Sequence, residues 1–424
     1  MGFLFAFWIC LVSATITVWH RSTDNPTSWY FNPSIGYQSQ YSNTRRQQAD
    51  AFIRKAQFFI GDKYALRDGA SPQASICIGV PTVARNGARY FRTTIGSLLE
   101  GLHPLERRRI FLISFIAHSD PTDHPAYSEN WLAEVSDRVL TYSDNETMAR
   151  MAELEGESEG YRQKALFDYR YLMQACVDTG LPYIGIIEDD VLALDGWFHR
   201  TMIALNKIAD HSDLPNESKY LAYLRLFHTE AYLGWNVEEW QSYFVGSTFS
   251  LIIFLTILVT LRHSFPVLSP YLGNDIIGIS CVVCFPLCVL LYFSSGRISI
   301  QPSKSTVQRM DNYGCCGQGL VYSRMRAQEI IPYYEQQKIG FADMITEQYA
   351  IEHRLSRWAV VPSVLQHMGH TSSKKVEDEV RVKDTEKKTI AEEIRSFSFE
   401  KHTPEVLRKE HDTASTPLGF LKAG

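Results

Sequence analysis

The chain has 424 residues, 45% of them hydrophobic and 12% aromatic, which is enough for one large domain or two ordinary domains with a real core. The formal net charge is −5 and no block of lysine and arginine occurs, so we expect no nucleic-acid partner. The eight cysteines are too few and too scattered for a disulfide scaffold, but one or two bridges would form in an oxidising lumen.

The first segment is a candidate membrane span. Residues 3–19 carry no charge and are long enough to cross a bilayer. A cleaved signal peptide is the rival interpretation, but no basic residue precedes the apolar run, and Trp19-His20-Arg21 is a poor cleavage site. We therefore expect an uncleaved anchor over residues 1–21.

A stem with a leading helix is expected over residues 22–74. Its first part is rich in Ser, Asn, Pro, Tyr and Gln, and apolar residues recur at helical spacing over 46–66. From residue 75 onward, short apolar runs alternate with helical patterns, which is typical of a mixed, mostly parallel sheet flanked by helices. The expected strands are 75–82, 109–117, 139–142, 184–187, 220–227, 314–322 (beginning as a glycine-rich loop) and 358–363, and the expected helices are 90–99, 161–176, 198–208 and 324–337.

Two apolar segments interrupt this pattern. Residues 243–261 and 276–293 are uncharged, and each is long enough to cross a bilayer. Two helices buried in a soluble core are the alternative, but apolar runs of this length without any charge are unusual there. We expect a tandem membrane hairpin over 243–296 that returns to the same side, so that 75–242 and 297–371 form two parts of one domain.

The last segment and the side of the membrane are less constrained. Residues 372–424 are dense in Lys and Glu and poor in aromatic residues, so we expect a disordered or loosely helical tail. The few basic residues that flank the spans favour cytosolic flanks. The glycosylation sequons that begin at Asn145 and Asn216 favour a lumenal location instead.

Three acids end the strand that is expected at 184–187. Glu188, Asp189 and Asp190 would lie at the carboxyl end of this strand, where open α/β sheets place their ligands. Adjacent carboxylates repel one another, and a divalent cation or a hydroxyl network would offset the repulsion. A solvated acidic turn is the alternative. His367 follows the last expected strand, and an imidazole ligand beside carboxylates favours Mn²⁺ over Mg²⁺.

These features together resemble a known group of enzymes. The acidic triplet is similar to the DxD or EDD motif of GT-A glycosyltransferases. The pattern PSxxQHxG at residues 362–369 resembles the C-terminal motif of the N-glycan GlcNAc-transferase IV family. A GT-A domain split by a tandem hairpin, with a further N-terminal span, is similar to the post-GPI-attachment protein 4 family of GPI-anchor N-acetylgalactosaminyltransferases. The chain looks like a fungal-type member, and the resemblance covers most of residues 75–370.

The resemblance implies a function. It implies a metal-dependent, inverting glycosyltransferase that moves a hexose or N-acetylhexosamine from a UDP-sugar to the glycan of GPI anchors. The expected location is the Golgi membrane, with three spans and a lumenal catalytic domain, where tethering raises the effective concentration of a membrane-anchored acceptor. An enzyme for N-glycan or glycolipid acceptors and an inactive glycosyltransferase-like membrane scaffold are the alternatives. The donor sugar and the linkage stay open.

Site residues follow from the same resemblance. Asp190 would hold the Mn²⁺ or Mg²⁺ ion, with His367 as the added ligand, while Glu188 and Asp189 would contact the ribose or order the waters of the metal. Further nucleotide-sugar contacts are expected from Pro81, Thr82, Arg85, Lys164, Asp168, Gly317 and Gly319.

Some of these residues have equally good structural interpretations. Lys164 and Asp168 have the spacing of an i,i+4 surface ion pair. Gly317-Gln318-Gly319 is either a place where backbone approaches the sugar or a tight turn. The adjacency of Cys315 and Cys316 disfavours a bridge between the two, although either could pair elsewhere.

The expected inversion needs one base that takes the proton of the acceptor hydroxyl. Asp343 and Glu347 lie four residues apart on one helical face and are the candidates. Asp343 is preferred because it follows Gly340-Phe341-Ala342 and should open the helix at the crevice. In the reverse assignment, Glu347 is the base and Asp343 is the N-cap.

Overall fold

The chain folds as two compact units. The computed structural model describes residues 2–56, 73–85, 87–210, 220–301, 306–310, 316–369 and 394–414. The first unit, which we call the helical unit, comprises Met1–Gln38 and Thr229–Ser303. The second, which we call the α/β unit, comprises Ser39–His228 and Lys304–Gly424. The chain therefore leaves the α/β unit after residue 228 and returns to it at residue 304.

A mostly parallel sheet forms the centre of the α/β unit. Within the described residues its eight strands have the order β3-β2-β1-β4-β8-β6-β9-β7. Neighbouring strands are parallel except that β8 is antiparallel to both β4 and β6, and β7 is antiparallel to β9. The strands are β1 (Ile76–Thr82), β2 (Ile110–Ile116), β3 (Arg138–Leu140), β4 (Tyr183–Ile187), β6 (Leu221–Arg225), β7 (Thr306–Arg309), β8 (Gly319–Ser323) and β9 (Ser356–Val361).

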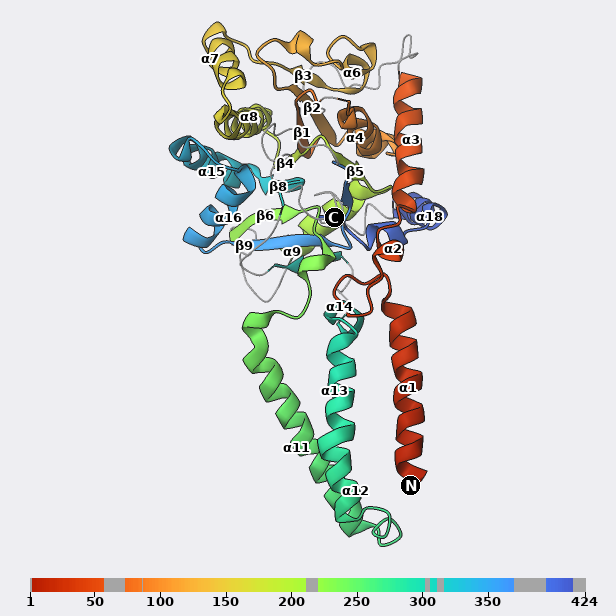
Figure 1. Ribbon diagram of the computed structural model, residues 1–424. Helices are drawn as coiled ribbons and strands as arrows, with labels where there is room; N and C mark the ends of the chain where they lie inside the picture. The colour runs from red at the N-terminus through yellow and green to blue at the C-terminus, as the bar shows by residue number, and fades with distance from the viewer. Residues whose placement is uncertain are drawn as a thin grey trace. The chain divides into compact units, whose positions relative to one another are not determined.

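Helices cover both faces of this sheet (Figure 1). One face packs against α3 (Tyr41–Ala56), α4 (Tyr90–Leu99), α6 (Asn130–Val135) and α9 (Trp197–Ala209). The other packs against α7 (Asn145–Gly156), α8 (Gly160–Val177), α15 (Arg324–Gln337) and α16 (Ala342–Glu352). Shorter elements of this unit are α5 (Pro104–Arg107) and the 3₁₀ turn η1 (Pro121–Asp123).

Burial on both faces explains the apolar runs in the sequence. Ile76, Ile78 and Val80 of β1 lie in one core cluster, and Cys77 lies in the cluster on the opposite face. Successive side chains of a strand point to opposite faces, so a strand covered on both sides has no polar alternation. Seven of the strands were predicted within a few residues of their bounds for this reason, and the mixed, mostly parallel α/β fold is confirmed.

One disulfide crosses the second core cluster. Cys77 of β1 and Cys176 of α8 are bonded, and 99 residues separate them in the sequence. The bridge confirms the expectation that this cysteine content permits one or two disulfides. Cys316 is also disulfide-bonded, whereas Cys315 lies outside the described residues.

A small second sheet, like strand β7, is a part of the fold that the sequence pattern did not reveal. Strand β5 (Val191–Ala193) follows the three acids directly, and it pairs antiparallel with β10 (Leu365–His367). The register places His367 opposite Val191. Both strands are three residues long, which is too short for a period-2 pattern to be recognised. This pairing brings the C-terminal motif beside the acids.

The helical unit contains the segments that were expected to span a membrane. Two stretches, Glu230–Ser264 and Asn274–Ser294, are long and apolar enough to cross one, and almost none of their residues are buried. The alternative of two buried core helices is therefore wrong. The elements are α1 (Gly2–Ser22), α2 (Pro33–Gly36), η2 (Glu230–Tyr232), η3 (Val237–Glu239), α11 (Trp240–Ser264), α12 (Asn274–Ile279), the π-helix η4 (Ser280–Cys284), α13 (Phe285–Ser294) and α14 (Arg297–Ile300).

Hydrogen bonds join the ends of these helices. The residues that follow α1 reach the end of α13, because Trp29 N–H and Ser28 Oγ–H both donate to Ser294 O at 3.0 Å. The indole N–H of Trp235, just before α11, donates to Phe293 O at 2.9 Å. The end of α1, the start of α11 and the end of α13 therefore meet at one end of the helical unit.

The C-terminal segment corrects one prediction. Residues 394–414 do not form a disordered tail, because they contain the 3₁₀ turn η5 (Phe399–Lys401) and the helix α18 (Pro404–Ala414), and they pack on the α/β unit. Phe399 is fully buried, and the Glu400 carboxylate accepts the backbone N–H groups of Gln40 and Ser42. The composition of the segment is that of a solvated tail, but two buried anchors outweigh it. The rest of the predicted tail lies outside the described residues.

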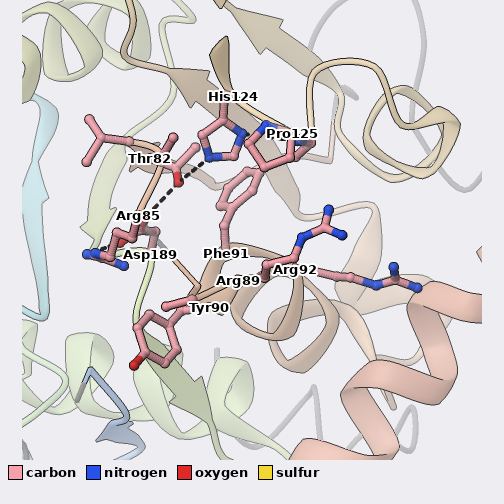
Figure 2. Close-up of a pocket in the computed structure, with 13 residues that line it drawn as sticks. Thr82, Arg85, Arg89, Tyr90, Phe91, Arg92, His124, Pro125 and Asp189 are labelled. Atoms are coloured by element: carbon pink, nitrogen blue, oxygen red, sulfur yellow. Dashed lines mark hydrogen bonds and ion pairs between the residues drawn. The ribbon is translucent and has the colours of Figure 1, made fainter. Parts of the chain in front are cut away.

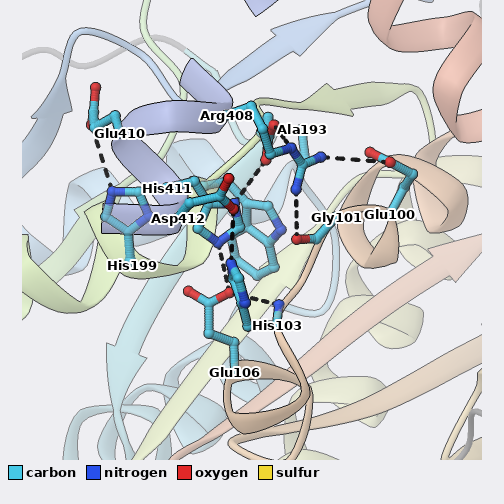
Figure 3. A network of polar contacts seen from close by, with 12 residues as sticks. Glu100, Gly101, His103, Glu106, Ala193, His199, Arg408, Glu410, His411 and Asp412 are labelled. Atoms are coloured by element: carbon cyan, nitrogen blue, oxygen red, sulfur yellow. Dashed lines mark hydrogen bonds and ion pairs between the residues drawn. The ribbon is translucent and has the colours of Figure 1, made fainter. Parts of the chain in front are cut away.

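The second anchor is His411 of α18. Its Nδ1–H donates to Asp195 Oδ1 at 2.8 Å and its Nε2–H donates to Glu106 Oε2 at 2.6 Å. Burial alone would lower the pKa of His411, but these two carboxylates outweigh it and raise the pKa to about 9. An imidazolium ion therefore holds α18 against the α/β unit (Figure 3).

This anchor predicts a loss of stability at alkaline pH. The pKa of His411 is raised from its ordinary 6.5 to about 9 in the folded chain, so its contribution is fully present below pH 6.5 and is lost as the pH rises through 9. The stabilisation at stake is on the order of 3 kcal/mol. Thermal unfolding of the detergent-solubilised protein between pH 6 and 9.5 measures it.

Two variants make this experiment specific. His411→Gln should unfold at a lower temperature at pH 6.5 and show a flatter pH dependence than the wild type. His353→Gln, which replaces an exposed histidine, should behave as the wild type does. An equal pH dependence of wild type and His411→Gln would contradict the prediction.

Candidate functional site

The site lies at the carboxyl ends of the parallel strands. The acids Glu188, Asp189 and Asp190 fill the connection between β4 and β5, beside the end of β1 and the start of β8. The backbone there is fixed by Thr94 of α4, whose hydroxyl lies 2.7 Å from the carbonyl oxygens of both Asp189 and Val191. The three carboxylates are thus held on a short, rigid turn, and each meets a different environment.

A chain of hydrogen bonds orients Asp189 (Figure 2). The Ala126 N–H donates to His124 Nδ1, so the ring proton is on Nε2, which donates to Thr82 Oγ1 at 3.1 Å. The Thr82 hydroxyl in turn donates to Asp189 Oδ2 at 2.5 Å. The other oxygen, Oδ1, contacts the Arg85 guanidinium at 2.7 Å.

Burial also determines the protonation state of His124. Burial, together with the nearby charges of His118 and Arg89, lowers the pKa of His124 to about 4. A neutral ring with one N–H is what the hydrogen-bond chain requires. His124 therefore acts as a fixed donor to Thr82.

Asp190 and His367 face each other across the second sheet. Asp190 Oδ2 lies 3.6 Å from His367 Nε2 and 3.3 Å from an Arg85 nitrogen. Asp190 Oδ1 and His367 Nδ1 are buried and have no hydrogen-bond partner among the described residues. A Cβ at Gly369 would overlap Asp190 Oδ2 and lie 3.0 Å from His367 Nε2, so the glycine keeps this space clear. A carboxylate and an imidazole with unused acceptor atoms suit a divalent cation.

The three acids differ in pKa because their partners differ. Burial, together with the charges of Asp190 and Asp343, raises the pKa of Glu188 well above its ordinary value. Burial raises the pKa of Asp189 to about 6, although Arg85 opposes the shift. For Asp190 burial works in the same direction, but His367 and Arg85 outweigh it and hold the pKa below its ordinary value. Adjacent carboxylates are thus tolerated because their ionisation is unequal.

Asp343 approaches the acids from the opposite wall. A Cβ at Gly317 would lie 3.2 Å from Asp343 Cβ and 3.4 Å from Glu188 Oε1, so Gly317 separates the two side chains. Helix α16 begins at Ala342 and its N-cap is Phe341. The assignment of Asp343 as N-cap is therefore wrong, because the residue lies inside the first turn of the helix.

Glu347 is committed to other partners. Its Oε1 accepts from the Tyr223 hydroxyl and from Arg225 at 2.8 Å, and its Oε2 lies 2.8 Å from Arg357 Nε. Both arginines are buried. With both oxygens engaged, Glu347 is poorly placed to take a proton from a substrate, and Asp343 is the better candidate of the two.

Lys164 and Asp168 form their ion pair in the interior. Lys164 Nζ lies 2.8 Å from Asp168 Oδ2 and donates to Ala117 O at 2.6 Å, while the Tyr142 hydroxyl donates to Asp168 Oδ1 at 2.5 Å. The i,i+4 pair exists, but the interpretation as a surface pair is wrong because both residues are buried. The Lys164 amine also contacts the Tyr142 hydroxyl, so its three donors are engaged near the end of β2.

Two further candidates lie in the scaffold. Pro81 is part of β1, where it is paired with Phe115 of β2. Gly319 begins β8, and a Cβ there would lie 2.5 Å from Leu365 Cδ1 and 3.3 Å from Leu226 Cβ. Gly319 therefore permits close packing of β10, which brings His367 to the acids.

Several residues at this site left no recognisable pattern in the sequence. His124 lies 42 residues after Thr82, and Thr94 lies on a helix whose pattern indicates only a buried face. The pocket beside Asp189 is lined by three arginines and one tyrosine of the same segment (Figure 2): Arg85, Arg89, Tyr90 and Arg92. Arg85 was among the predicted nucleotide contacts, and it contacts Asp189 and Asp190. Arg89 was not predicted, and it pairs with Glu129.

A second cluster has metal-binding residue types. Glu106, His199 and His411 are buried and present ligand atoms within 4.8 Å of one another. Both ring nitrogens of His411 already donate to carboxylates, and its ring stacks on that of His199 with an interplanar angle of 27°. The ion-pair anchor described above accounts for this cluster.

Comparisons with known proteins show what the chain is similar to. The model of a family described as GPI-N-acetylgalactosamine transferase PGAP4 matches residues 76–366, which is more than half of the chain. Alpha-1,3-mannosyl-glycoprotein 4-beta-N-acetylglucosaminyltransferase A of Macaca fascicularis is 28% identical over 141 residues, covering 30% of this chain and 25% of the relative. The corresponding enzyme B of Mus musculus is 29% identical over 134 residues, covering 28% and 24%. The chain thus spans about a quarter of the length of the curated relatives it matches.

The unused acceptor atoms of Asp190 and His367 predict cation binding. Asp190→Ala and His367→Ala should each weaken Mn²⁺ binding well over tenfold, since even outer-shell partners of a metal are worth roughly 10- to 100-fold. Titration of the purified protein with Mn²⁺, followed by electron paramagnetic resonance, measures this without any substrate. Asp123→Asn, at an exposed acid, is the control. Wild-type affinity in both site variants would rule out the proposed ligands.

Proposed function

The chain belongs to the family described as GPI-N-acetylgalactosamine transferase PGAP4, and on that premise we propose that it transfers an N-acetylhexosamine or a hexose from a UDP-sugar to the glycan of GPI anchors, with inversion. One observation carries the proposal. Asp190 and His367 present unused buried acceptor atoms at the carboxyl end of the sheet, and Asp343 lies across Gly317 from the same acids. A cation site and a candidate base on opposite walls suit sugar transfer from a nucleotide donor.

The donor would bind along the end of β1. Asp190 and His367 would hold Mn²⁺ or Mg²⁺, which when bound neutralises the diphosphate that departs with the nucleotide. Arg85, Arg89 and Arg92 line the adjoining pocket, where Arg85 is paired with Asp189 and Asp190, and Arg89 with Glu129. Asp189, oriented by Thr82 and Arg85, would accept hydrogen bonds from the ribose hydroxyls.

Asp343 would supply the base. Its carboxylate is partly exposed and lies at the first turn of α16, facing Glu188 across Gly317. As the acceptor oxygen forms its bond to the anomeric carbon, Asp343 would take the hydroxyl proton, and UDP would leave on the opposite face with the electrons of the broken bond. One base and one displacement give inversion at that carbon.

The helical unit suits a membrane-anchored acceptor. The two stretches that can cross a bilayer, with α1 as a third span, would place both parts of the α/β unit on one side. The hydrogen bonds between the ends of α1, α11 and α13 support that arrangement. Disulfides at Cys77–Cys176 and at Cys316 lie on either side of the hairpin in sequence and favour an oxidising lumen, in keeping with a Golgi enzyme.

The tethering itself has a chemical purpose. A GPI glycan is attached to lipid, so anchoring the enzyme in the same membrane raises the effective concentration of the acceptor. Transfer to an N-glycan is the second candidate, because the curated relatives named above act on mannosyl-glycoproteins. An acceptor of that kind would not require a tandem hairpin in addition to one anchor.

The first test concerns the chemistry. With UDP-GalNAc, UDP-GlcNAc or UDP-Gal and Mn²⁺, Asp343→Asn should lower kcat by roughly 10²- to 10⁴-fold, the usual contribution of a general base. UDP binding should change little, because Asp343 is not among the donor contacts. Glu352→Gln, on the same helix, is the matched control. If Asp343→Asn keeps wild-type turnover while Glu347→Gln loses it, Glu347 is the base.

The second test concerns the acceptor. Mass spectrometry of GPI glycans released from cells that lack the protein should show the loss of one hexose or N-acetylhexosamine. Wild-type protein should restore that residue, and Asp190→Ala should not. Unchanged GPI glycans together with altered N-glycans would reject the GPI acceptor in favour of the second candidate.

The lumenal orientation predicts a modification at Asn145. This residue is exposed as the first residue of α7, within the sequon Asn145-Glu146-Thr147. Peptide-N-glycosidase should reduce the apparent mass of the protein, and Asn145→Gln should remove one glycan. Asn130→Gln, an exposed helix-start asparagine outside any sequon, should change nothing. A wild-type protein without any N-glycan would contradict the orientation.

A further inference from the structure

We infer that Arg225 is a positioning residue that holds the two walls of the site, the loop at Gly317 and the helix that carries Asp343, at a fixed separation. The inference rests on the proposed role of Asp343. It concerns a fully buried residue of β6.

Arg225 is completely buried and reaches two separate elements. One guanidinium nitrogen donates to the carbonyl oxygen of Cys316. The other donates to Glu347 Oε1 at 2.8 Å and to the Tyr223 hydroxyl at 3.1 Å. A buried charge is costly unless it is paired and hydrogen-bonded, so these contacts are conditions of its presence.

The first element is a strained loop. Cys316 has a φ of +105°, which is unfavourable for a residue with a side chain, and Gly317 follows it between Glu188 and Asp343. The hydrogen bond from Arg225 to the Cys316 carbonyl oxygen holds this conformation. Loss of that hydrogen bond allows the loop to relax and Gly317 to move.

The second element is α16. Glu347 lies one turn after Asp343 and is held from two neighbouring strands, by Arg225 of β6 and by Arg357 of β9. Arg357 approaches Glu347 Oε2 at 2.8 Å and also its backbone carbonyl at 3.4 Å. The start of the helix, where Asp343 lies, is thereby fixed to the sheet.

Arginine is required because one side chain serves both elements. The planar guanidinium carries donors on both terminal nitrogens, so it bridges the Cys316 carbonyl and the Glu347 carboxylate at once. A lysine ammonium keeps the charge but places all of its donors on one atom, so it does not reproduce the planar fork that the two terminal nitrogens of Arg225 present to these acceptors. Arg225→Lys should therefore loosen the coupling of the loop to α16 while the interior keeps its charge.

The test separates positioning from stability. In the detergent-solubilised full-length enzyme, Arg225→Lys should lower kcat about 10- to 100-fold, as a displacement of about 1 Å does at a reacting centre. The dissociation constant for UDP with Mn²⁺ should stay within about threefold of wild type, because the donor contacts lie on β1, β4 and β10. Glu347→Gln should likewise lower kcat and leave the dissociation constant for UDP nearly unchanged. The pH dependence of kcat should change in both variants.

Controls and contrary results are specific. Arg326→Lys replaces another buried arginine, which donates to Leu221 O at 3.1 Å, and should lower the melting temperature without lowering kcat. The inference is wrong if Arg225→Lys keeps the wild-type kcat and pH profile. If Arg225→Lys does not fold, the same result for Glu347→Gln would contradict the inference. If Asp343→Asn keeps full turnover, the base assignment fails whatever Arg225 does. A large effect of Arg225→Lys with an inactive Asp343→Asn supports both.

Discussion

The repulsion among three adjacent carboxylates at the end of β4 is the constraint on which the rest of the site depends. Each acid is accommodated by different contacts. Burial raises the pKa of Glu188, Thr82 and Arg85 bind Asp189, and His367 and Arg85 stabilise the charge of Asp190. These partners come from β1, from the loop that follows it and from β10, so the whole carboxyl edge of the sheet is needed to keep one tripeptide folded. An acidic, solvated turn would need none of them, and that interpretation does not fit the burial of Asp189 and Asp190.

The two parts of the α/β unit interdigitate at this edge. The first part supplies β4 and β6, and the second part places β8 between them, antiparallel to both. That insertion carries Gly317 to Glu188, and the segment after β9 carries His367 to Asp190. Neither part contains a complete site. The chain must therefore return to the α/β unit after residues 229–303. Two membrane spans would satisfy this requirement, because an even number of spans brings the chain back to the side of the membrane from which it left.

Sequence patterns predicted those elements whose burial leaves a periodic trace. The strands β1 to β4 and helix α8 were found because apolar residues repeat along them, and the acids were singled out because they break an apolar run. The donors His124, Thr94 and Arg225 were not found, because their partners lie 42 to 122 residues away and only the tertiary fold brings them together. Spacing also could not separate Asp343 from Glu347, since both lie on one helical face. Their difference comes from Arg225 and Arg357, which occupy only the second carboxylate.

The place where the chain leaves the α/β unit follows from strand direction. Strand β8 is antiparallel to both β4 and β6, so β4 and β6 run the same way and end at the same edge of the sheet. The acids follow β4 at that edge, and residue 228, the last before the helical unit, follows β6 only three residues after its end. Hydrogen bonds fix the backbone there as well. The Leu226 N–H donates to Gly319 O, and the His228 N–H donates to Ser363 Oγ. The tether to the helical unit thus begins beside the site rather than at the far edge.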